Sequence, residues 1–299
     1  MKTLPTVRQM QYLLALADTL HFGEAAQKCF VTQSTLSAGI RDLETLLNVQ
    51  LFERTKRIVR LTADGHQMVA RAKTIIQLTT DLSDAAASTH PLRGPLRLGI
   101  IPTIAPYLLP HTLPGIRRQY PELELILVED ESANIVAQLQ AGELDVILYA
   151  LPFPSAGLHN QQIQTDSFYL TVPADHPLAN RTSVSIADFA DEPMLLLNQG
   201  HCLREHAMDA CKLQGGAPTN GFSGTSLQTI VQMVAGGLGI TILPEMAVAS
   251  GLAAQVGLKT IALSGTSSAR NIAMAWREIS PRKEEFTLLS GLFQTERLA

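Results

Sequence analysis

A short segment of the chain holds two cysteines among residues that can tune a thiol. It reads Gly200-His201-Cys202-Leu203-Arg204-Glu205-His206-Ala207-Met208-Asp209-Ala210-Cys211. A helical pattern starts after Gly200, which would place Cys202 near the positive end of a helix, with His201 and Arg204 close by. That setting stabilises a thiolate, the form that reacts with peroxide to give a sulfenic acid. A second cysteine, Cys211, would then resolve the sulfenic acid to a disulfide.

The spacing of the two cysteines couples this chemistry to a change of shape. If residues 202–211 formed one helix, the two Cα atoms would lie roughly 13 Å apart. A disulfide requires them within ~7 Å of each other. Forming the bond would therefore bend or unwind the segment, and a reversible bond that forces local refolding is a two-state switch.

Two other interpretations of this segment stay open. Free cysteines are usually small buried apolar residues. A metal site could recruit His201, Cys202, His206 and Cys211, but Cys211 is badly placed for it and the sequence offers no CxxC pair. We expect no metal and no cofactor. The third cysteine, Cys29, is expected inside a helix, where it would have a packing role.

Residues 21–47 have the pattern of a helix-turn-helix. Ala25 and Ala26 are small enough for a second helix to cross closely, and residues 30–32 form a turn in which Thr32 caps the next helix. That helix would bury Leu36, Ile40, Leu43 and Leu47. Its opposite face would present polar groups suited to the bases and phosphates of a major groove, namely Gln33, Ser34, Thr35, Ser37 and Arg41.

Two further elements follow this motif. Residues 52–62 resemble a two-stranded wing whose basic side chains suit a phosphate backbone, namely Arg54, Lys56, Arg57 and Arg60. Residues 61–90 have the pattern of one long amphipathic helix. It is either a core element or, as we favour, a dimerisation helix paired with its copy from a second chain. Two prolines and a glycine in residues 88–95 then mark a boundary.

From about residue 91 onward, strand patterns alternate with helical ones. The strands are expected at 96–101, 123–128, 144–149, 168–172, 194–197 and 240–243, and the main helices at 104–120, 134–141 and 227–235. This order predicts an open, mostly parallel sheet of the α/β type. The length allows two lobes around a cleft.

Composition and charge fit this organisation. The chain has 299 residues, 46% hydrophobic and 17% charged, and a net charge of -4. Residues 1–60 hold eight Lys/Arg against five Asp/Glu, so the remainder carries minus seven, as suits a nucleic-acid-binding head on a sensing body. No membrane span, signal peptide or disulfide framework is expected, which indicates a cytoplasmic protein. No GxSxG elbow, Walker loop or HExxH motif supports a hydrolase, NTPase or zincin.

Together these features resemble the LysR-type transcriptional regulators. The resemblance rests on Ala25-Ala26, Val31 to Ser37, Ile40, Leu43-Glu44 and Leu51 to Arg54, and it extends to residues 225–244. It departs from the family at Ser34, where proline is frequent. It implies a winged helix-turn-helix at 1–60, a linker helix at 61–90 and a regulatory domain at 91–299, built like type 2 periplasmic binding proteins. Lobe I would hold 91–165 and 269–299, and lobe II 166–268.

The same resemblance implies a regulator and not an enzyme. Such a protein would form a homotetramer, a dimer of dimers, that binds a double-stranded DNA operator, with RNA polymerase as a further partner. Residues 99–110, 142–145 and 200–211 are similar to the peroxide-sensing members, which implies a sensor of hydrogen peroxide that activates or represses antioxidant genes. Cys202 would then be the peroxide-reactive cysteine and Cys211 the resolving one. The pocket would comprise Thr103, Ser132, His201, Arg204 and Arg270, with Ser132 in a place that usually holds threonine.

Two rival functions remain at this point. One is a LysR-type regulator that answers to a small anion or aromatic acid between the lobes, with inert cysteines. The other is an enzyme, such as a thiol peroxidase, that carries a helix-turn-helix.

Overall fold

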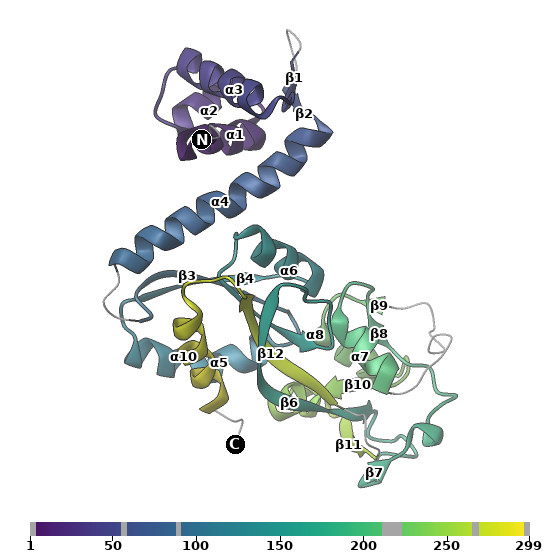
Figure 1. Ribbon diagram of the computed structural model, residues 1–299. Coiled ribbons are helices and arrows are strands. Elements are labelled where there is room, and N and C mark those ends of the chain that lie inside the picture. Colours follow the sequence, from purple (N-terminus) through teal and green to yellow (C-terminus); the bar gives the residue numbers. More distant parts are fainter. Residues whose placement is uncertain (1–3, 55–58, 88–90, 211–222, 265–268, 296–299) are drawn as a thin grey trace. The chain divides into compact units, whose positions relative to one another are not determined.

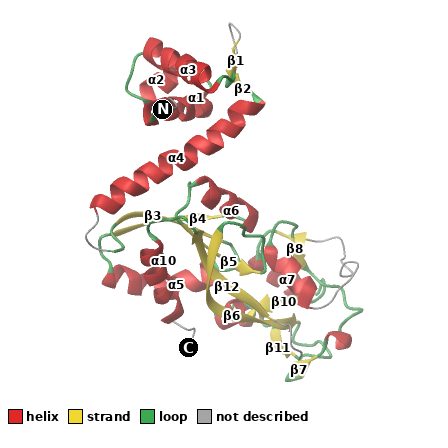
Figure 2. Ribbon diagram, in the orientation of Figure 1, coloured by secondary structure: helices red, strands yellow, loops and turns green. Residues whose placement is uncertain are grey.

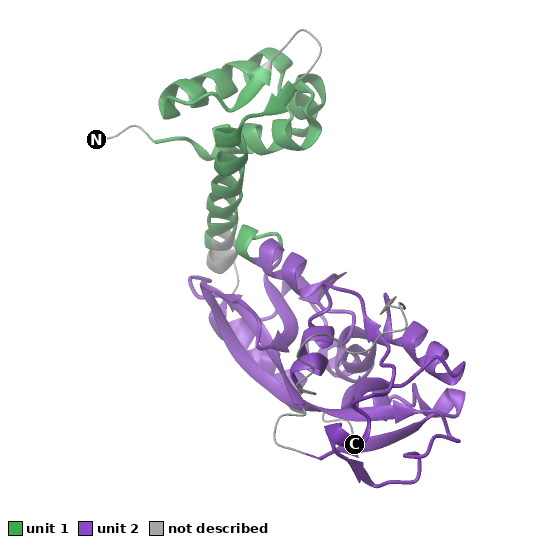
Figure 3. Cartoon of the chain, turned by 90° about the vertical axis from the view of Figure 1, so that its right-hand side faces the viewer, with its two compact units in different colours: residues 1–89, 140–143 green, residues 90–139, 144–299 purple. Residues whose placement is uncertain are grey.

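The chain divides into two compact units, each with its own hydrophobic core. The computed structural model describes residues 4–54, 59–87, 91–210, 223–264 and 269–295. Unit 1 comprises residues 1–89 with 140–143, and unit 2 comprises residues 90–139 with 144–299 (Figure 3).

Unit 1 begins with three helices around a small core. These are α1 (Val7–Thr19), α2 (Phe22–Lys28) and α3 (Gln33–Leu47), and the hairpin of β1 (Phe52–Arg54) and β2 (Val59–Leu61) follows them (Figure 1). Thr32 caps α3 as predicted, because its Oγ1 accepts a hydrogen bond from the Thr35 N–H at 3.2 Å. Leu36, Ile40 and Leu43 are buried as expected, whereas Leu47 at the end of the helix is only half-buried.

The long helix of unit 1 is α4 (Ala63–Ala87). It starts two residues later than predicted, because Leu61 pairs with Phe52 in the hairpin. The predicted end of the helix, at 88–90, lies outside the described residues. Cys29 was expected within a helix, but α2 ends at Lys28 and Cys29 is the residue that caps its C-terminal end. Its side chain is half-buried. The helix ends here because Phe30 turns the chain with a positive φ of 55°.

Unit 2 opens with the predicted alternation of strands and helices. The order is β3 (Gly94–Ile100), α5 (Ala105–Gln119), β4 (Leu123–Glu129), α6 (Ser132–Ala141) and β5 (Val146–Leu151). Strand β3 lies between β4 and β5 and runs parallel to both.

The expectation of a mostly parallel sheet is wrong for the rest of unit 2. Strand β12 (Ala269–Arg277) runs antiparallel to β5 on one side and to β6 (Leu158–Val172) on the other. The second half of β6 pairs antiparallel with β10 (Thr241–Pro244) and β11 (Lys259–Leu263). Figure 2 shows β6 and β12 as long neighbouring strands. The reason for the difference is that β6 follows β5 after a short loop and that β12 returns between the two.

The remaining elements of unit 2 surround the second half of β6. They are β7 (Ser183–Val184), a 3₁₀ turn (Ile186–Asp188), β8 (Leu196–Leu197), α7 (Cys202–Ala210), β9 (Ser223–Gly224), α8 (Leu227–Ala235), α9 (Glu245–Ala249) and a second 3₁₀ turn (Ala254–Val256). Helix α8 has the predicted bounds, and it ends at the glycine run because Gly236 caps it. Helix α10 (Lys283–Thr295) follows β12.

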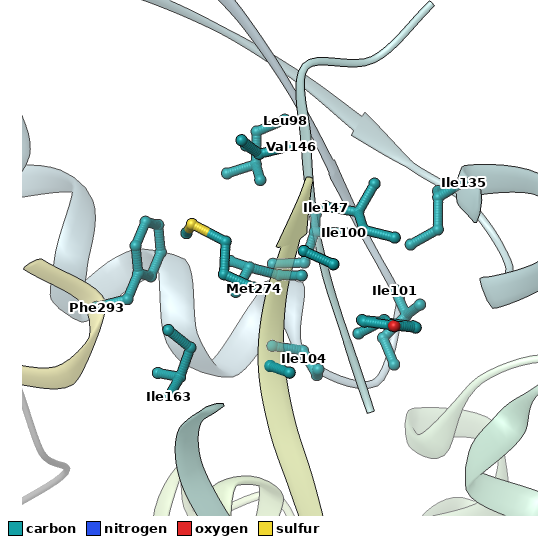
Figure 4. Packing of buried hydrophobic residues seen from close by; sticks show 14 of the residues in the cluster. Leu98, Ile100, Ile101, Ile104, Ile135, Val146, Ile147, Ile163, Met274 and Phe293 are labelled. Carbon is teal, nitrogen blue, oxygen red and sulfur yellow. The ribbon is translucent and has the colours of Figure 1, made fainter. Parts of the chain in front are cut away.

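Two core clusters define the lobes of unit 2. Lobe I is built on β3, β4, β5, β12 and the first half of β6, and Figure 4 shows its core, with Phe293 of α10 on one side of Met274 and Ile135 of α6 on the other. Lobe II is built on the second half of β6 with β10, β11 and α8. Strand β6 joins the two lobes, because its first part pairs with β12 in lobe I and its second part pairs with β10 and β11 in lobe II.

Candidate functional site

The exposed face of α3 carries the polar residues expected of a recognition helix. Gln33, Ser34, Thr35 and Arg41 are exposed, and Ser37 is half-buried. The Thr32 Oγ1 lies 2.9 Å from the Ser34 hydroxyl and 2.8 Å from the Thr35 hydroxyl. The hydroxyls at the start of the helix are therefore held in place, while Gln33 and Arg41 remain available to bases and phosphates.

One residue of this motif escaped the sequence interpretation. A Cβ at Gly39 would lie 2.6 Å from the Tyr12 ring, so α3 crosses α1 at a distance that only glycine permits. The predicted small residues of α2, Ala25 and Ala26, are buried as expected. Close packing of α3 thus depends on small residues in α3 as well as in α2, and a lone glycine within a helical pattern was the only signal.

The wing is present as a hairpin. Phe52 pairs with Leu61, and Arg54 pairs with Val59. Lys56, Arg57 and the side chain of Arg54 lie outside the described residues. Arg60 on β2 is exposed.

Cys202 is the first residue of α7 and is a free thiol with 6% of its surface exposed. Gly200, two residues earlier, has a φ of +106°, a conformation that favours glycine. The side chain of Cys202 belongs to the core of lobe I, whereas Leu203 and Ala207 of the same helix belong to the core of lobe II. The thiol therefore lies where a lobe II helix meets lobe I.

The segment before α6 lies against this helix start. The Glu131 carboxylate occupies the space beside Gly200 into which a Cβ would point. Its Oε1 is 3.9 Å from the Nε2 of His201, whose side chain is mostly buried. Ser132 follows Glu131 and begins α6. Its hydroxyl is buried and has no hydrogen-bond partner among the described residues.

Thr103 and Arg270, two residues that the resemblance placed in the pocket, are hydrogen-bonded to each other. The buried Arg270 guanidinium donates to the Thr103 Oγ1 at 2.8 Å from Nη1 and to the Thr103 carbonyl oxygen at 2.8 Å from Nη2. Its Nε donates to the Asp166 Oδ2 at 2.9 Å. The second oxygen of Asp166 accepts the Met246 N–H at 3.0 Å. Arg270, Thr103 and Asp166 are thus each held by at least two hydrogen bonds.

Burial controls the ionisation of the groups around Arg270. It raises the pKa of Asp166, an effect that the nearby Arg270 and the Met246 N–H partly offset. It also raises the pKa of Tyr107 to about 12, with a small opposing effect of Arg270. Neither Asp166 nor Tyr107 was predicted as a site residue, because a single acidic residue or tyrosine in a strand or helix pattern carries no signal.

Arg204 and His206, on the same helix as Cys202, contact other partners. Arg204 Nη1 donates to the Leu197 carbonyl oxygen at 3.1 Å, so its guanidinium is directed toward a residue of lobe II. The Nε2 of His206 lies 3.0 Å from the Pro152 carbonyl oxygen. Burial, together with Arg270, lowers the pKa of His206, although the Pro152 carbonyl partly opposes this.

Cys211, the other half of the expected pair, lies outside the described residues. Within the described ranges, His, Cys, Asp and Glu side chains nowhere gather in threes as a metal site requires. The helices of those ranges include none both long and apolar enough to cross a membrane.

Two family models match the chain and together span nearly all of it. Residues 7–66 match the bacterial regulatory helix-turn-helix protein of the lysR family, and residues 89–296 match the LysR substrate binding domain. The chain belongs to the LysR family of transcriptional regulators. Its architecture is therefore that of a DNA-binding regulator, with a helix-turn-helix domain and a two-lobed α/β regulatory domain.

Two relatives of this LysR-type regulator are similar to most or all of the chain. The HTH-type transcriptional regulator EstR of Acinetobacter baylyi is 40% identical over 295 residues, which cover 98% of both chains. The DNA-binding transcriptional dual regulator OxyR of Escherichia coli K12 is 42% identical over 243 residues, or 81% of this chain and 80% of that one.

Solved structures of OxyR proteins share the fold over the whole chain. Full-length OxyR of Pseudomonas aeruginosa, with a cysteine-to-aspartate substitution, is 35% identical with a TM-score of 0.80, and covers 99% of this chain and 100% of that one. A peroxide-bound cysteine variant of Corynebacterium glutamicum OxyR is 34% identical with a TM-score of 0.67, and covers 99% and 94%. The regulator is thus related to the OxyR peroxide sensors.

Proposed function

We propose that this LysR-type regulator senses hydrogen peroxide through Cys202 and converts the signal into altered DNA binding. The observation that carries the proposal is the environment of the thiol. Cys202 is buried at the first turn of α7, where the two lobes meet, and the unpartnered hydroxyl of Ser132 lies on the helix that starts beside Gly200 and His201. This hydroxyl is buried and has no partner among the described residues, so it is free to form a hydrogen bond with a peroxide oxygen.

The proposed reaction begins at the sulfur of Cys202. Its thiolate attacks one oxygen of hydrogen peroxide, the O–O bond breaks, and the departing hydroxide takes up a proton to leave as water. Cys202 is then a sulfenic acid. The Cys211 thiolate attacks this sulfur, the S–S bond forms, and the sulfenic oxygen leaves as a second water after taking up a proton. Two thiols are oxidised and one peroxide is reduced to two waters.

The surrounding residues would bind and orient the peroxide. Ser132 and His201 can donate hydrogen bonds to it, and Cys202 is the first residue of α7. Arg270 holds Thr103 in a fixed position through two bonds. Arg204 is directed toward Leu197, so its part would be to support α7 and not to contact peroxide.

The output would pass to the DNA through α3 and the wing. Gln33, Ser34, Thr35, Ser37 and Arg41 would read the operator, and Arg54, Lys56 and Arg57 would contact its phosphates. A change in the packing of residues 200–215 would alter how subunits assemble and so re-space the DNA-reading heads. In this account the targets are antioxidant genes, and RNA polymerase is the partner at the promoter.

The described face of α4 supports pairing with a second chain. Ile75, Leu78 and Leu82, spaced i, i+3 and i+7, expose 44%, 39% and 71% of their surface. An apolar stripe of this kind on a long helix is the pattern of a dimerisation helix. We propose a homotetramer in which these helices form one of the two interfaces.

A second candidate function is a metabolite-responsive regulator with inert cysteines. The burial of Cys202 in an apolar core favours it. A buried, unreactive thiol would then be only a packing group.

DNA binding in the two redox states separates these functions. A duplex would first be selected from a random-sequence library by the purified full-length protein, and its nuclease protection would be compared before and after hydrogen peroxide. We expect peroxide to shift the protected region in the wild type and in Cys29→Ser, and to leave it unchanged in Cys202→Ser. An equal shift in Cys202→Ser, or no shift in the wild type, would overturn the proposal.

A further inference from the structure

His206 makes a buried hydrogen bond across the boundary between the lobes. It lies one helical turn after Cys202 on α7, and only 7% of its surface is exposed. Its Nε2 is 3.0 Å from the carbonyl oxygen of Pro152. A carbonyl oxygen can only accept a hydrogen bond, so the proton of the neutral ring is on Nε2 and the lone pair is on Nδ1.

The two ends of this bond belong to different lobes. Pro152 follows β5 of lobe I, whereas α7 buries Leu203 and Ala207 in the core of lobe II. Cys202 extends from the same helix into the core of lobe I. Residues four apart lie on one face of a helix. The face of α7 that delivers the thiol to lobe I is therefore fastened to lobe I by His206.

The other ring nitrogen shows that packing alone does not account for a histidine here. The Nδ1 is buried and has no hydrogen-bond partner among the described residues. An unsatisfied buried nitrogen weakens the packed arrangement, and an apolar side chain of similar size would avoid that loss. What such a side chain would lack is the bond to Pro152. A histidine at this position thus provides the hydrogen bond to Pro152 in lobe I, although its Nδ1 has no partner among the described residues.

We propose that His206 is a positioning residue of the thiol switch. Its bond to Pro152 holds α7 in the arrangement that buries reduced Cys202, and the bond breaks when the segment bends to bring Cys211 to Cys202. His206 thereby stabilises the reduced form and makes the disulfide more oxidising. This inference rests on the peroxide-sensing function proposed above.

The reduction potential of the Cys202–Cys211 disulfide is the quantity to measure, because a residue with a merely structural role would not shift it selectively. Full-length protein would be equilibrated in glutathione buffers of graded ratio, alkylated, and scored by mass spectrometry for the Cys202–Cys211 disulfide. One buried hydrogen bond corresponds to about a tenfold change in this equilibrium. His206→Leu is therefore expected to shift the potential by about 30 mV to a more negative value.

Two further variants make the test specific. His206→Gln keeps an N–H donor for the Pro152 carbonyl, so it should restore the wild-type potential. His176→Leu removes another largely buried histidine, within lobe II, where its Nδ1 accepts the Leu178 N–H at 3.2 Å, and it should leave the potential unchanged.

The outcomes distinguish this inference from the proposed function. If the disulfide had the same reduction potential in His206→Leu as in the wild type, the proposed role of His206 would be overturned, and the sensor function would stand. A His206→Gln potential as negative as that of His206→Leu would overturn the hydrogen bond as its cause. A wild-type protein that forms no disulfide at any buffer ratio would remove the sensor and this inference with it.

Discussion

The guanidinium of Arg270 and the carboxylate of Asp166 form an ion pair with no exposed surface, at 2.9 Å between their nearest atoms. The pair joins β12 to β6, the strand that runs through both lobes. Arg270 also fixes Thr103, and Asp166 fixes the start of α9 through the Met246 N–H. One buried pair thereby ties together β12, β6, the turn at Thr103 and the start of α9.

Removal of the Asp166 charge should strongly destabilise the regulatory domain. In Asp166→Asn the side chain keeps its size, but the Arg270 charge is left buried without a counterion, which costs about 3–5 kcal/mol. We expect thermal unfolding of that domain to move down by roughly 6–20 °C. Arg93→Gln breaks the exposed pair with Glu122 and should change the midpoint by no more than about 4 °C. Equal midpoints for Asp166→Asn and the wild type would contradict the structural role of the pair.

The hydroxyl of Ser132 should matter for the reaction with peroxide and little for the fold. Loss of one hydrogen bond to the bound peroxide in Ser132→Ala is expected to slow sulfenic acid formation at Cys202 by about tenfold. Ser132→Thr keeps the hydroxyl and should react at a rate close to the wild type. Stopped-flow measurement of the reduced protein mixed with hydrogen peroxide gives these rates.

A matched control for Ser132 exists in lobe II. Thr171 on β6 is also buried, and its hydroxyl has no partner among the described residues. Thr171→Val should therefore leave the peroxide rate unchanged. If Ser132→Ala reacted as fast as Thr171→Val, Ser132 would have no part in the peroxide pocket.

The stability of the protein should decline with falling pH in a way that depends on His206. Burial and Arg270 lower the pKa of His206 in the folded chain. In the unfolded chain the pKa of a histidine is about 6.5. Below that pH the unfolded state takes up a proton that the folded state does not, so stability is lost as pH falls. Urea unfolding at pH 7.5 and pH 5.5 should show a smaller loss in His206→Gln than in the wild type. Parallel losses in the two proteins would mean that His206 is protonated equally in both states.

The first residue of α3 should contribute to operator specificity. Gln33 is exposed at the first turn of α3, which we propose enters the major groove. A good contact between an amide side chain and a base is worth about 1–3 kcal/mol of discrimination. Gln33→Ala should weaken binding to the selected duplex by about tenfold or more. It should also reduce the difference in affinity between that duplex and unrelated DNA. Fluorescence anisotropy at fixed salt measures both. Gln11→Ala, an exposed glutamine on α1, is the matched control, and an effect as large as that of Gln33→Ala would argue against the recognition role.

The DNA-binding motif could be predicted from the sequence because its determinants are local. The cap at Thr32 and the apolar spacing of Leu36, Ile40 and Leu43 lie within a few residues of each other. The same holds for α8, which is bounded by Ser226 and Gly236. The close crossing at Gly39 was missed because it depends on Tyr12, in a different helix.

The buried network of Arg270 was harder to predict because its contacts are distant in sequence. Arg270 and Asp166 are 104 residues apart, and Arg270 and Thr103 are 167 apart. No periodicity predicts such pairs, and only the family resemblance pointed to Arg270 and Thr103. Strand β12 was missed for a similar reason, since its place between β5 and β6 is a matter of topology.

Mass-spectrometric mapping of thiols tests the central claim most directly. The fully reduced protein would receive about one equivalent of hydrogen peroxide, and remaining thiols would be alkylated within seconds. We predict a Cys202–Cys211 disulfide in most molecules, with Cys29 still free. If Cys202 and Cys211 remained alkylatable after prolonged exposure, the account would be contradicted and the cysteines would be inert.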